Sequence, residues 1–413
     1  MYLSNYQLSE KKERLFLLSL FIISIIIRIP VVLITGDTSL ENEWEILVNN
    51  LINYKILAYN YYDSSLNKFL FPSVYMPPLY AYYLYFFSFF NLAGENYILL
   101  ILFSQILLSS LSVILFYEVN KIFFSRNISF LSSILFSFIP IHLYACGQIS
   151  SVTLQTFFSV LFYFFFFRFV QKKDLISIFY LSILSGLTIL LRGEFTAIFF
   201  ITLLLLFFLF KVSFKKIILI FLVTLITISP YLIRNIETFE KFTITKSFGY
   251  NLWKGNNPNS IVEGYSQINS ELREKIHLIE KNKYYGINFD NIFKEEAIKN
   301  IKTEPKKYLS LFVEKFFSYL FIDINSSNRK YYNPFHYIPI LLLSITALAG
   351  IVLSDKKSYK LNYLIVIFFT NIIIFSCFFI LPRYKLAIIP LQIIFTNIFI
   401  VYIQKKFFYG NKR

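Results

Sequence analysis

The sequence predicts an all-α protein that crosses a membrane many times. Hydrophobic residues make up 56% of the 413 residues and charged residues only 15%, whereas an ordinary soluble domain is about one quarter charged. Apolar runs recur that are long enough to cross a hydrocarbon layer, which takes about 20 helical residues, and short polar breaks separate them. This composition excludes a soluble fold of this length.

Roughly ten apolar segments have the length of a membrane-spanning helix. They are 15–34, 98–119, 128–146, 152–170, 174–192, 194–211, 216–234, 334–354, 361–380 and 386–404. The first follows Lys11, Lys12 and Arg14, as the apolar part of a signal peptide would, but it lacks a small-residue cleavage site and further spans follow. We therefore expect it to remain as an anchor.

The basic residues predict the orientation of these spans, because Lys and Arg are retained on the cytoplasmic side of short loops. With both termini cytoplasmic, five basic clusters fall inside: Lys121/Arg126, Arg168/Lys172/Lys173, Lys211/Lys215/Lys216, Lys356/Lys357/Lys360 and Lys405/Lys406/Lys412/Arg413. Segments 35–97 and 235–333 then lie outside a cell membrane. The sequence thus predicts three parts: 1–234 with its outer loop, an external segment 235–333, and C-terminal spans in 334–413.

This orientation requires that segment 75–92 does not cross the membrane. The segment is rich in Tyr and Phe and includes Pro77 and Pro78, a composition typical of a helix at the water–lipid interface. We therefore expect an interfacial helix there. An ordinary crossing helix, with a compensating error elsewhere, is the alternative.

The net charge of +16 raises the question of a nucleic-acid partner. The positive residues are spread over membrane-flanking loops and form no single arm or stripe, so anionic membrane lipids are favoured and nucleic acid is not. Cys146 and Cys377 lack metal-ligand spacing, and neither a phosphate-binding glycine loop nor a His pair is present. No cofactor is predicted, and a divalent metal is compatible with the acidic outer loop but unsupported by a tight cluster.

Acidic residues follow the first span: Asp37, Glu41, Glu43 and Glu45. From Glu41 the pattern is that of an amphipathic helix, with one apolar side formed by Trp44, Leu47, Val48 and Leu51. Such carboxylates can orient or deprotonate an acceptor hydroxyl, or hold a metal. The competing interpretation is a helix that carries acids because it faces water.

Three arginines from separate helices fall at the predicted outer boundary: Arg192, Arg234 and Arg383. Each alone is explained by snorkelling to the interface, but together they suit an anion such as a lipid phosphate. The external stretch GYNLWKGNNP, residues 249–258, is expected to form tight loops whose backbone N–H groups face an anion.

Two helices are expected later in the external segment. Residues 290–305 predict a helix that stops at Pro305, and 306–321 an interfacial helix that does not cross. The apolar side of the first contains Ile292, Phe293, Ala297, Ile298 and Ile301.

Four stretches in order resemble the GT-C glycosyltransferases related to the protein O-mannosyltransferases, glycosyltransferase family 39. They are the acidic loop with WEILVNNL and PSVYMPPLYAYYL; LLRGEF; SPYLIRN with GYNLWKGNNP; and FKEEAIKNIKTEPKKYLSLFVEKF with PRYKLAIIP. The resemblance covers most of the chain. It implies a GT-C-type bundle with a catalytic first outer loop. Two departures are Leu40 or Glu41 at the family's aspartate, and Val152 where relatives often have an acid.

The resemblance also implies an activity: transfer of a sugar, with inversion, from a polyprenyl-phosphate donor to an external acceptor hydroxyl on an envelope glycan, a lipid or a protein. Position matching puts the general base on Glu41, then Glu43, then Asp37. The donor-binding candidates are Arg192, Arg234, Asn235, Lys254, Asn256, Arg383 and Tyr384, and the candidates for positioning the acceptor or its loop are Tyr75, Pro77 and Pro78. Nucleotide sugars are not expected outside the cytoplasm, which agrees with a lipid-linked donor.

Two other functions remain open at this stage. A transporter or flippase of lipid-linked saccharides would share the spans and the interfacial arginines, but it should show internal repeats and interrupted helices at mid-membrane depth. A non-catalytic relative that binds lipid-linked sugar would explain the two departures from the family pattern.

Overall fold

The computed structural model describes residues 10–40, 42–62, 68–90, 94–326 and 333–409. Most of this part of the chain is helical. The bundle consists of α1 (Glu10–Thr35), α4 (Glu95–Asn120), α5 (Arg126–Phe138), α6 (Pro140–Ala145), α7 (Val152–Lys172), α8 (Leu175–Leu191), α9 (Phe195–Phe208), α10 (Phe214–Phe239), α15 (Pro334–Val352), α16 (Tyr359–Ser376) and α17 (Ile389–Tyr409).

Six of the described helices are long and apolar enough to cross a membrane: α1, α4, α7, α10, α15 and α16. The helices α8 and α9 are apolar but shorter. The multi-pass membrane character is therefore confirmed, whereas the count of ten crossings stays a prediction. On α1 the side chains of Leu33 and Ile34 are 72% and 82% exposed, as expected of side chains that face lipid.

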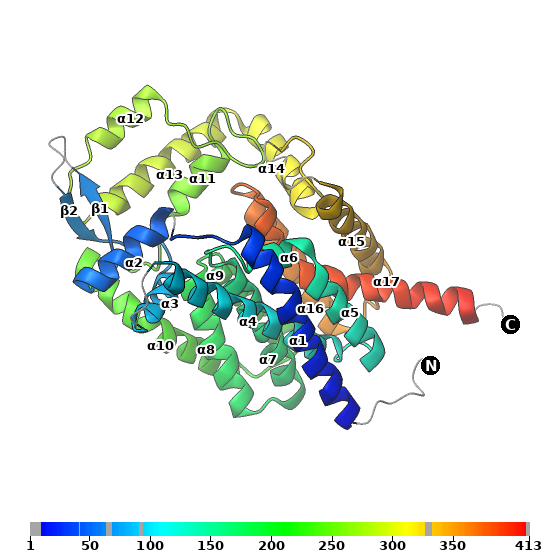
Figure 1. The fold of residues 1–413 in the computed structure, drawn as a ribbon. Coiled ribbons are helices and arrows are strands. Elements are labelled where there is room, and N and C mark those ends of the chain that lie inside the picture. The colour runs from blue at the N-terminus through cyan, green and yellow to red at the C-terminus, as the bar shows by residue number, and fades with distance from the viewer. Residues whose placement is uncertain (1–9, 41, 63–67, 91–93, 327–332, 410–413) are drawn as a thin grey trace.

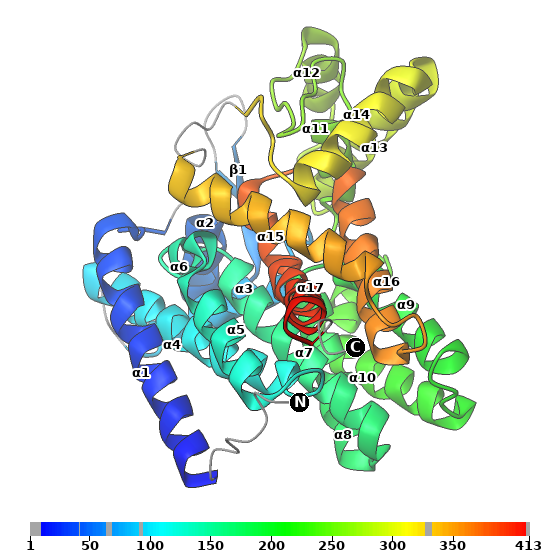
Figure 2. The ribbon, with the colours of Figure 1, turned by 90° about the vertical axis from the view of Figure 1, so that its right-hand side faces the viewer.

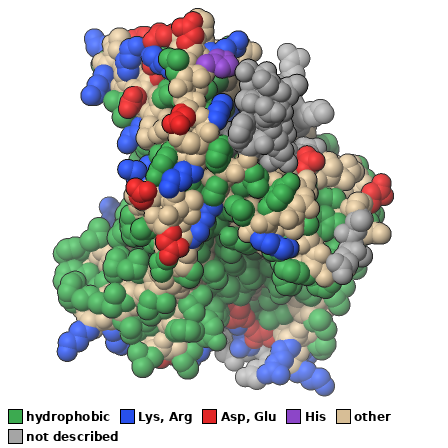
Figure 3. Space-filling model, turned by 90° about the vertical axis from the view of Figure 1, so that its left-hand side faces the viewer, with side chains coloured by type: hydrophobic (Ala, Val, Ile, Leu, Met, Phe, Trp, Pro, Cys, Tyr) green, Lys and Arg blue, Asp and Glu red, His purple; other side chains and the backbone are tan. Residues whose placement is uncertain are grey.

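The remaining elements lie at one end of the bundle, which we call the loop side (Figures 1 and 2). They are α2 (Asn42–Tyr54), β1 (Ala58–Tyr62), β2 (Lys68–Pro72), α3 (Pro78–Ser88), α11 (Phe248–Gly255), α12 (Ser270–His277), α13 (Tyr285–Thr303), α14 (Pro305–Leu320) and the 3-10 helix η2 (Pro382–Ala387). Residues 10 and 409 lie at the opposite end, which we call the terminal side. Figure 3 shows hydrophobic side chains over a band below the more charged loop side.

The outer loop contains a hairpin that the all-α prediction omitted. The strands β1 and β2 pair antiparallel, with Ala58 opposite Pro72 and Tyr62 opposite Lys68. Aromatic residues such as Tyr59 and Phe71 favour extended backbone. The all-α fold class is nevertheless confirmed, because this short hairpin is a small exception in a part of the chain that is mostly helical.

The expected span 128–146 is two helices, so its interpretation as one continuous helix is wrong. Helix α5 ends at Phe138, and α6 begins at Pro140 with Ile139 between them at φ −58° and ψ 120°. Proline lacks the N–H that a continuing helix needs, and its ring clashes with the preceding turn. The break turns α6 toward the loop side.

A polar cluster inside the bundle fixes α1 against α4, α5 and α6. The guanidinium group of Arg28, which is fully buried, donates to the hydroxyl of Ser109 at 2.8 Å and of Ser137 at 3.3 Å, and to the carbonyl of Ser24 at 2.9 Å. Its third nitrogen lies 3.2 Å from Nδ1 of His142. Because a buried charge must be hydrogen-bonded to be tolerated, this cluster sets the position of the end of α1.

Several other expectations for the loop side are confirmed. The apolar face of α2 is buried, with Trp44 and Leu51 8% and 3% exposed. Helix α3 has 11 residues, about half of the length that a crossing requires, which supports an interfacial segment. Helix α13 ends at Thr303, and Pro305 opens α14.

Candidate functional site

The turn between α6 and α7 holds the first acidic residue of the outer loop. The backbone N–H of Asp37 donates to the carbonyl of Gly147 at 2.9 Å, and Oδ2 of Asp37 accepts the N–H of Ile149 at 2.6 Å. The amide of Gln148 donates to the carbonyl of Thr35 at 2.9 Å. The Asp37 carboxylate therefore has a fixed position where α1 ends.

Two buried polar side chains, Tyr80 and Gln105, connect this turn to α3 and α4. The hydroxyl of Tyr80 on α3 donates to Oε1 of Gln105 on α4 at 3.0 Å. The amide nitrogen of Gln105 donates in turn to the carbonyls of Cys146 at 3.2 Å and Gln148 at 3.0 Å. Burial is the main cause of the raised pKa of the Tyr80 phenol, and the negative charge of Asp37 raises this pKa further. One chain of contacts thus joins α3, α4 and the turn.

The other predicted carboxylates occupy the start of α2. Glu41, the first candidate for the base, lies outside the described residues. Glu43 is half-buried in the first turn of α2, within electrostatic range of Lys254 on α11. Burial lowers the pKa of Lys254, the nearby Arg383 lowers it further, and the Glu43 carboxylate opposes both. Glu43 of α2 and Arg383 of η2 are therefore both within electrostatic range of Lys254 of α11.

Arg192 lies at the end of α8 with several partners. Its Nε donates to Glu194 at 2.7 Å, and one terminal nitrogen lies 3.4 Å from the hydroxyl of Ser151. The guanidinium carbon is 5.6 Å from the ring centre of Tyr384 in η2. The Arg192 side chain retains 19% exposure. Arg383 also lies 5.8 Å from the Tyr384 ring.

The helix η2 carries both Arg383 and Tyr384, and α14 holds it in place. The carbonyl of Tyr384 accepts the hydroxyl of Tyr319 at 2.8 Å. The ring of Phe375 stacks on Tyr384 at 5.0 Å and on Tyr319 at 5.3 Å. Because η2 also packs on α6 and α7, it faces the turn that binds Asp37. Arg383 is exposed.

Lys385, which was not among the predicted site residues, also connects η2 to α14. Its ammonium group is 5% exposed and donates to the carbonyls of Ser318 and Tyr319 at 2.9 Å each, and to that of Phe321. Cations stabilise the free carbonyls at a helix C-terminus, and here they are those of α14. Burial lowers the pKa of Lys385 to about 7.

Arg234 and Asn235 form contacts within the outer loop. The guanidinium group of Arg234 donates to the carbonyls of Ser73 at 2.9 Å and Leu57 at 3.1 Å, which flank the hairpin, and to Oδ1 of Asn235 at 2.7 Å. Asn235 is fully buried and donates to the carbonyl of Thr243 at 2.6 Å. These contacts brace the hairpin against α10, so the structure offers a positioning role for both residues.

Asn256 joins the end of α11 to the end of α16. Its amide donates to the carbonyls of Leu252 at 2.7 Å and Cys377 at 2.9 Å, and its Oδ1 lies 3.4 Å from the ammonium of Lys315. Lys315 is fully buried in α14 and donates to the carbonyl of Gly255 at 2.6 Å. Burial lowers the pKa of Lys315 to about 7. The predicted asparagine therefore holds α11, and the lysine that supports it was missed.

The expectation of anion-facing loops is wrong for residues 249–255, which belong to α11. Its two glycines permit close packing: a Cβ on Gly249 would lie 2.0 Å from the carbonyl of Asp290, and one on Gly255 would lie 1.9 Å from that of Phe378. The N–H of Tyr250 donates to the Asp290 carboxylate at 3.0 Å, which satisfies the start of the helix.

The last group of candidates opens α3. Pro77 is the N-cap and Pro78 the first helical residue, positions that suit proline. The carbonyl of Tyr75 accepts the hydroxyl of Thr245 at 2.6 Å, and its ring lies 6.4 Å from that of Tyr250. These residues therefore link the outer loop to the segment between α10 and α11.

Within the described ranges, no three His, Cys, Asp or Glu side chains form a group that could hold a metal ion.

Comparison with known proteins agrees with this architecture. The family model described as dolichyl-phosphate-mannose-protein mannosyltransferase matches residues 76–233, which extend from the start of the α3 segment into α10. No curated protein matches the sequence.

Solved structures of the oligosaccharyltransferase from Archaeoglobus fulgidus have a similar fold. The complex with Zn and sulfate matches with a TM-score of 0.56 and 12% identity, and the complex of AglB with an inhibitory peptide and a dolichol-phosphate with 0.54 and 13%. A form tethered to an acceptor peptide with the NVT sequon matches with 0.56 and 12%. Each match covers 94% of this chain and 50% of the other.

The chain therefore spans about half the length of the solved structures that it matches. The predicted resemblance is confirmed by two kinds of comparison, one of sequence segments and one of folds. The chain is a membrane protein with a fold similar to that of the archaeal oligosaccharyltransferase, and its residues 76–233 match the family model described as dolichyl-phosphate-mannose-protein mannosyltransferase.

Proposed function

We propose that the chain is a membrane glycosyltransferase that moves a sugar from a polyprenyl-phosphate donor to an acceptor hydroxyl. The observation that carries the proposal is the arrangement around the α6–α7 turn: the Asp37 carboxylate is bound to this turn, and η2, with Arg383 and Tyr384, packs against the two helices that the turn connects. The similar AglB structure contains a dolichol-phosphate, and another contains an acceptor peptide. Those ligands support a lipid-linked donor here.

In the proposed reaction the acceptor oxygen attacks the anomeric carbon of the sugar. The bond from that carbon to the phosphate oxygen breaks, the polyprenyl phosphate leaves with the electron pair, and a carboxylate takes the acceptor proton. Arg192, Arg383 and Lys254 would stabilise the charge that develops on the phosphate. Because the displacement is single, the anomeric configuration inverts.

The geometry favours Asp37 as the base among the three candidates. A general base needs a fixed position near the proton that it removes, and the Asp37 carboxylate is held at 2.6 Å by the N–H of Ile149. Glu43 is within electrostatic range of Lys254, where its negative charge would favour the charged form of that lysine. Glu41 lies outside the described residues and stays in the experiment as the alternative.

We further propose that the loop side faces out of the cell and that both termini are cytoplasmic. The distribution of basic residues supports this orientation. The terminal side carries Lys121 and Arg126 in the α4–α5 region, and Lys356, Lys357 and Lys360 around the start of α16. A polyprenyl-phosphate sugar would then reach the site from the outer leaflet.

The test is a transfer assay with purified protein in proteoliposomes, a radiolabelled polyprenyl-phosphate sugar and an extract of envelope acceptors. We expect hydroxyl-linked product from the wild type and from Glu45→Gln, which is the matched control on α2, and a loss of about a hundredfold or more in Asp37→Asn. Loss in Glu41→Gln alone would move the base to that residue. Binding of the donor without product in the wild type would contradict the proposed function.

A further inference from the structure

A cavity of about 760 Å³ opens on the terminal side, at the end of the bundle away from Asp37 and Arg192. It is formed where the turn after α4, the ends of α7 and α9, the turn between α15 and α16, and the second half of α17 meet. Its size is in the range of small-molecule binding sites. Nothing in the proposed transfer reaction uses this cavity.

The lining of the cavity combines apolar side chains with polar and charged ones, and we call its two lysines, Lys360 and Lys405, the rim lysines. Phe123, Phe210 and Ile398 are among the hydrophobic side chains of the wall. Lys360 and Lys405 line it as well, from the start of α16 and from α17. Apolar side chains beside two cations suit an amphipathic anion. The chemistry is that of a phosphate group joined to hydrocarbon.

Neither lysine forms an ion pair with a described residue, because the ion pairs of the described part of the chain involve other cations. The acidic residue of the lining, Asp355, uses its carboxylate to accept the N–H of Lys357 at 3.0 Å. Two lysines against one aspartate leave the lining with one net positive charge, which a partner from outside the chain can balance.

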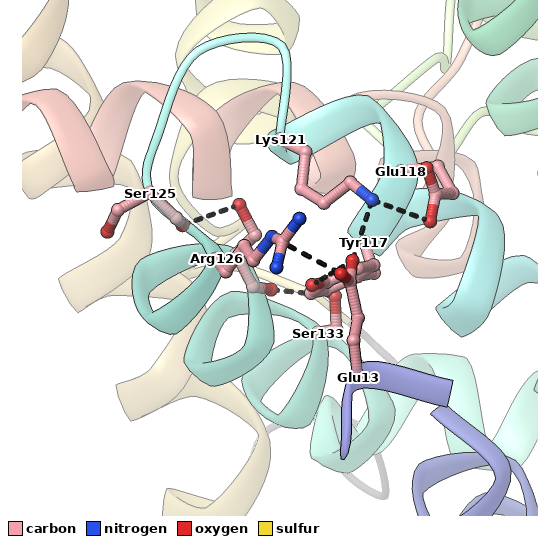
Figure 4. A network of polar contacts seen from close by, with 8 residues as sticks. Glu13, Tyr117, Glu118, Lys121, Ser125, Arg126 and Ser133 are labelled. Atoms are coloured by element: carbon pink, nitrogen blue, oxygen red, sulfur yellow. Dashed lines mark hydrogen bonds and ion pairs between the residues drawn. The ribbon is translucent and has the colours of Figure 1, made fainter. Parts of the chain in front are cut away.

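Neighbouring cations on the same side behave differently (Figure 4). Lys121 binds the carboxylates of Glu13 at 2.8 Å and Glu118 at 3.1 Å, and Arg126 binds Glu13 at 3.2 Å. The hydroxyl of Tyr117 donates to the same Glu13 at 2.8 Å. The α4–α5 region is thus neutralised internally, while the lysines at the cavity are not.

We propose that this cavity binds one anionic phospholipid from the leaflet on the terminal side. The helices α4, α7 and α16, which contribute to it or lead into it, are apolar and long enough to cross the membrane, so the cavity opens at the level of the lipid head groups. The phosphate lies between Lys360 and Lys405, and part of an acyl chain lies on the aromatic wall. Basic pockets between membrane helices bind lipid head groups in this way.

Bound lipid would also join helices that are distant in sequence. The cavity brings the turn after α4 together with α17 and with the turn between α15 and α16. A ligand that binds only the folded protein raises its apparent melting temperature. Anionic lipid should therefore stabilise the purified protein more than zwitterionic lipid does.

The test measures lipid retained by the full chain after purification from nanodiscs of mixed phosphatidylglycerol and phosphatidylcholine. The variant Lys360→Gln/Lys405→Gln removes both rim charges. The control Lys356→Gln/Lys357→Gln removes two exposed charges from the adjacent turn, outside the lining. Each lysine near a membrane contributes about fivefold, so we expect about thirtyfold weaker retention of phosphatidylglycerol in the first variant and little change in the control.

A second variant fills the cavity without changing charge: Leu361→Trp places a larger side chain in the lining. We expect it to lose phosphatidylglycerol while it elutes as a folded protein in size-exclusion chromatography. Equal loss in the rim variant and its control would show a diffuse charge effect and overturn the proposal. Retention of phosphatidylglycerol by both the rim variant and Leu361→Trp would overturn it as well.

Discussion

Lys385 is the buried cation whose replacement has the most defined consequences. Its ammonium group binds the carbonyls of Ser318, Tyr319 and Phe321. In Lys385→Met these three carbonyls lose their donor at a site that is 5% exposed. Each orphaned carbonyl costs about 1–3 kcal/mol, and removal of a buried charge offsets part of the sum, so we expect a net loss of about 3 kcal/mol.

The same variant changes the pH dependence of stability. Burial lowers the pKa of Lys385 to about 7, whereas an unfolded lysine titrates near 10.4. Between these values the unfolded chain binds a proton that the folded chain has released, so stability rises with pH by about 1.4 kcal/mol per pH unit. Below pH 7 both states are charged and this slope vanishes. Lys315 contributes a slope of the same sign in both proteins.

Thermal unfolding in detergent at a fixed scan rate measures both effects. An unfolding entropy of about 2.1 cal/mol/K per residue makes 3 kcal/mol equivalent to a fall of roughly 3 °C in the apparent Tm of a chain this long. The deficit of Lys385→Met relative to the wild type should grow between pH 7 and pH 9. The control is Lys356→Met, which replaces an exposed lysine. An unchanged Tm and an unchanged pH slope in Lys385→Met would refute the reasoning.

Three further substitutions test other contacts. Arg234→Lys loses the two guanidinium contacts to the carbonyls that flank the hairpin. Chymotrypsin should therefore cut the outer loop several-fold faster in this variant than in the control Arg273→Lys, which changes an exposed arginine. Equal cleavage rates would argue against the role of Arg234 in holding the hairpin. Gly255→Ala places a Cβ 1.9 Å from a backbone carbonyl and should cost more than about 3 kcal/mol in thermal unfolding. The control is Gly193→Ala, whose Cβ would meet only the methyl group of Thr245 at 3.0 Å and which should cost about 1 kcal/mol or less; equal losses would contradict close packing. Arg192→Gln should weaken binding of a polyprenyl phosphate about tenfold in an equilibrium assay, and unchanged binding would remove Arg192 from the donor site.

The sequence was sufficient for the membrane architecture because hydrophobic composition and helix length are local properties. The spacing of apolar residues in 44–51 likewise predicted the buried face of α2. Local signals were weaker for the hairpin, whose strands have five residues each. The break at Pro140 was a readable signal that a hydropathy pattern alone does not use.

The candidate site was predicted in part. The loop-side arginines were found because charges at the ends of apolar runs stand out in the sequence. Lys315 and Lys385 were missed because each looks like a solvated residue beside polar neighbours, and its role comes from carbonyl groups about 60 or more positions away along the chain. The packing of Gly249 and Gly255 against other segments was hidden for the same reason.

The central claim is that sugar leaves a polyprenyl phosphate at the loop side and joins an acceptor hydroxyl with Asp37 as the base. The most direct measurement counts both products of one reaction: polyprenyl phosphate released and sugar attached to acceptor by the purified protein in proteoliposomes. The account predicts equal amounts from the wild type, and neither product from Asp37→Asn while the donor still binds. Movement of donor between leaflets without released polyprenyl phosphate, or equal activity in Asp37→Asn, would contradict it.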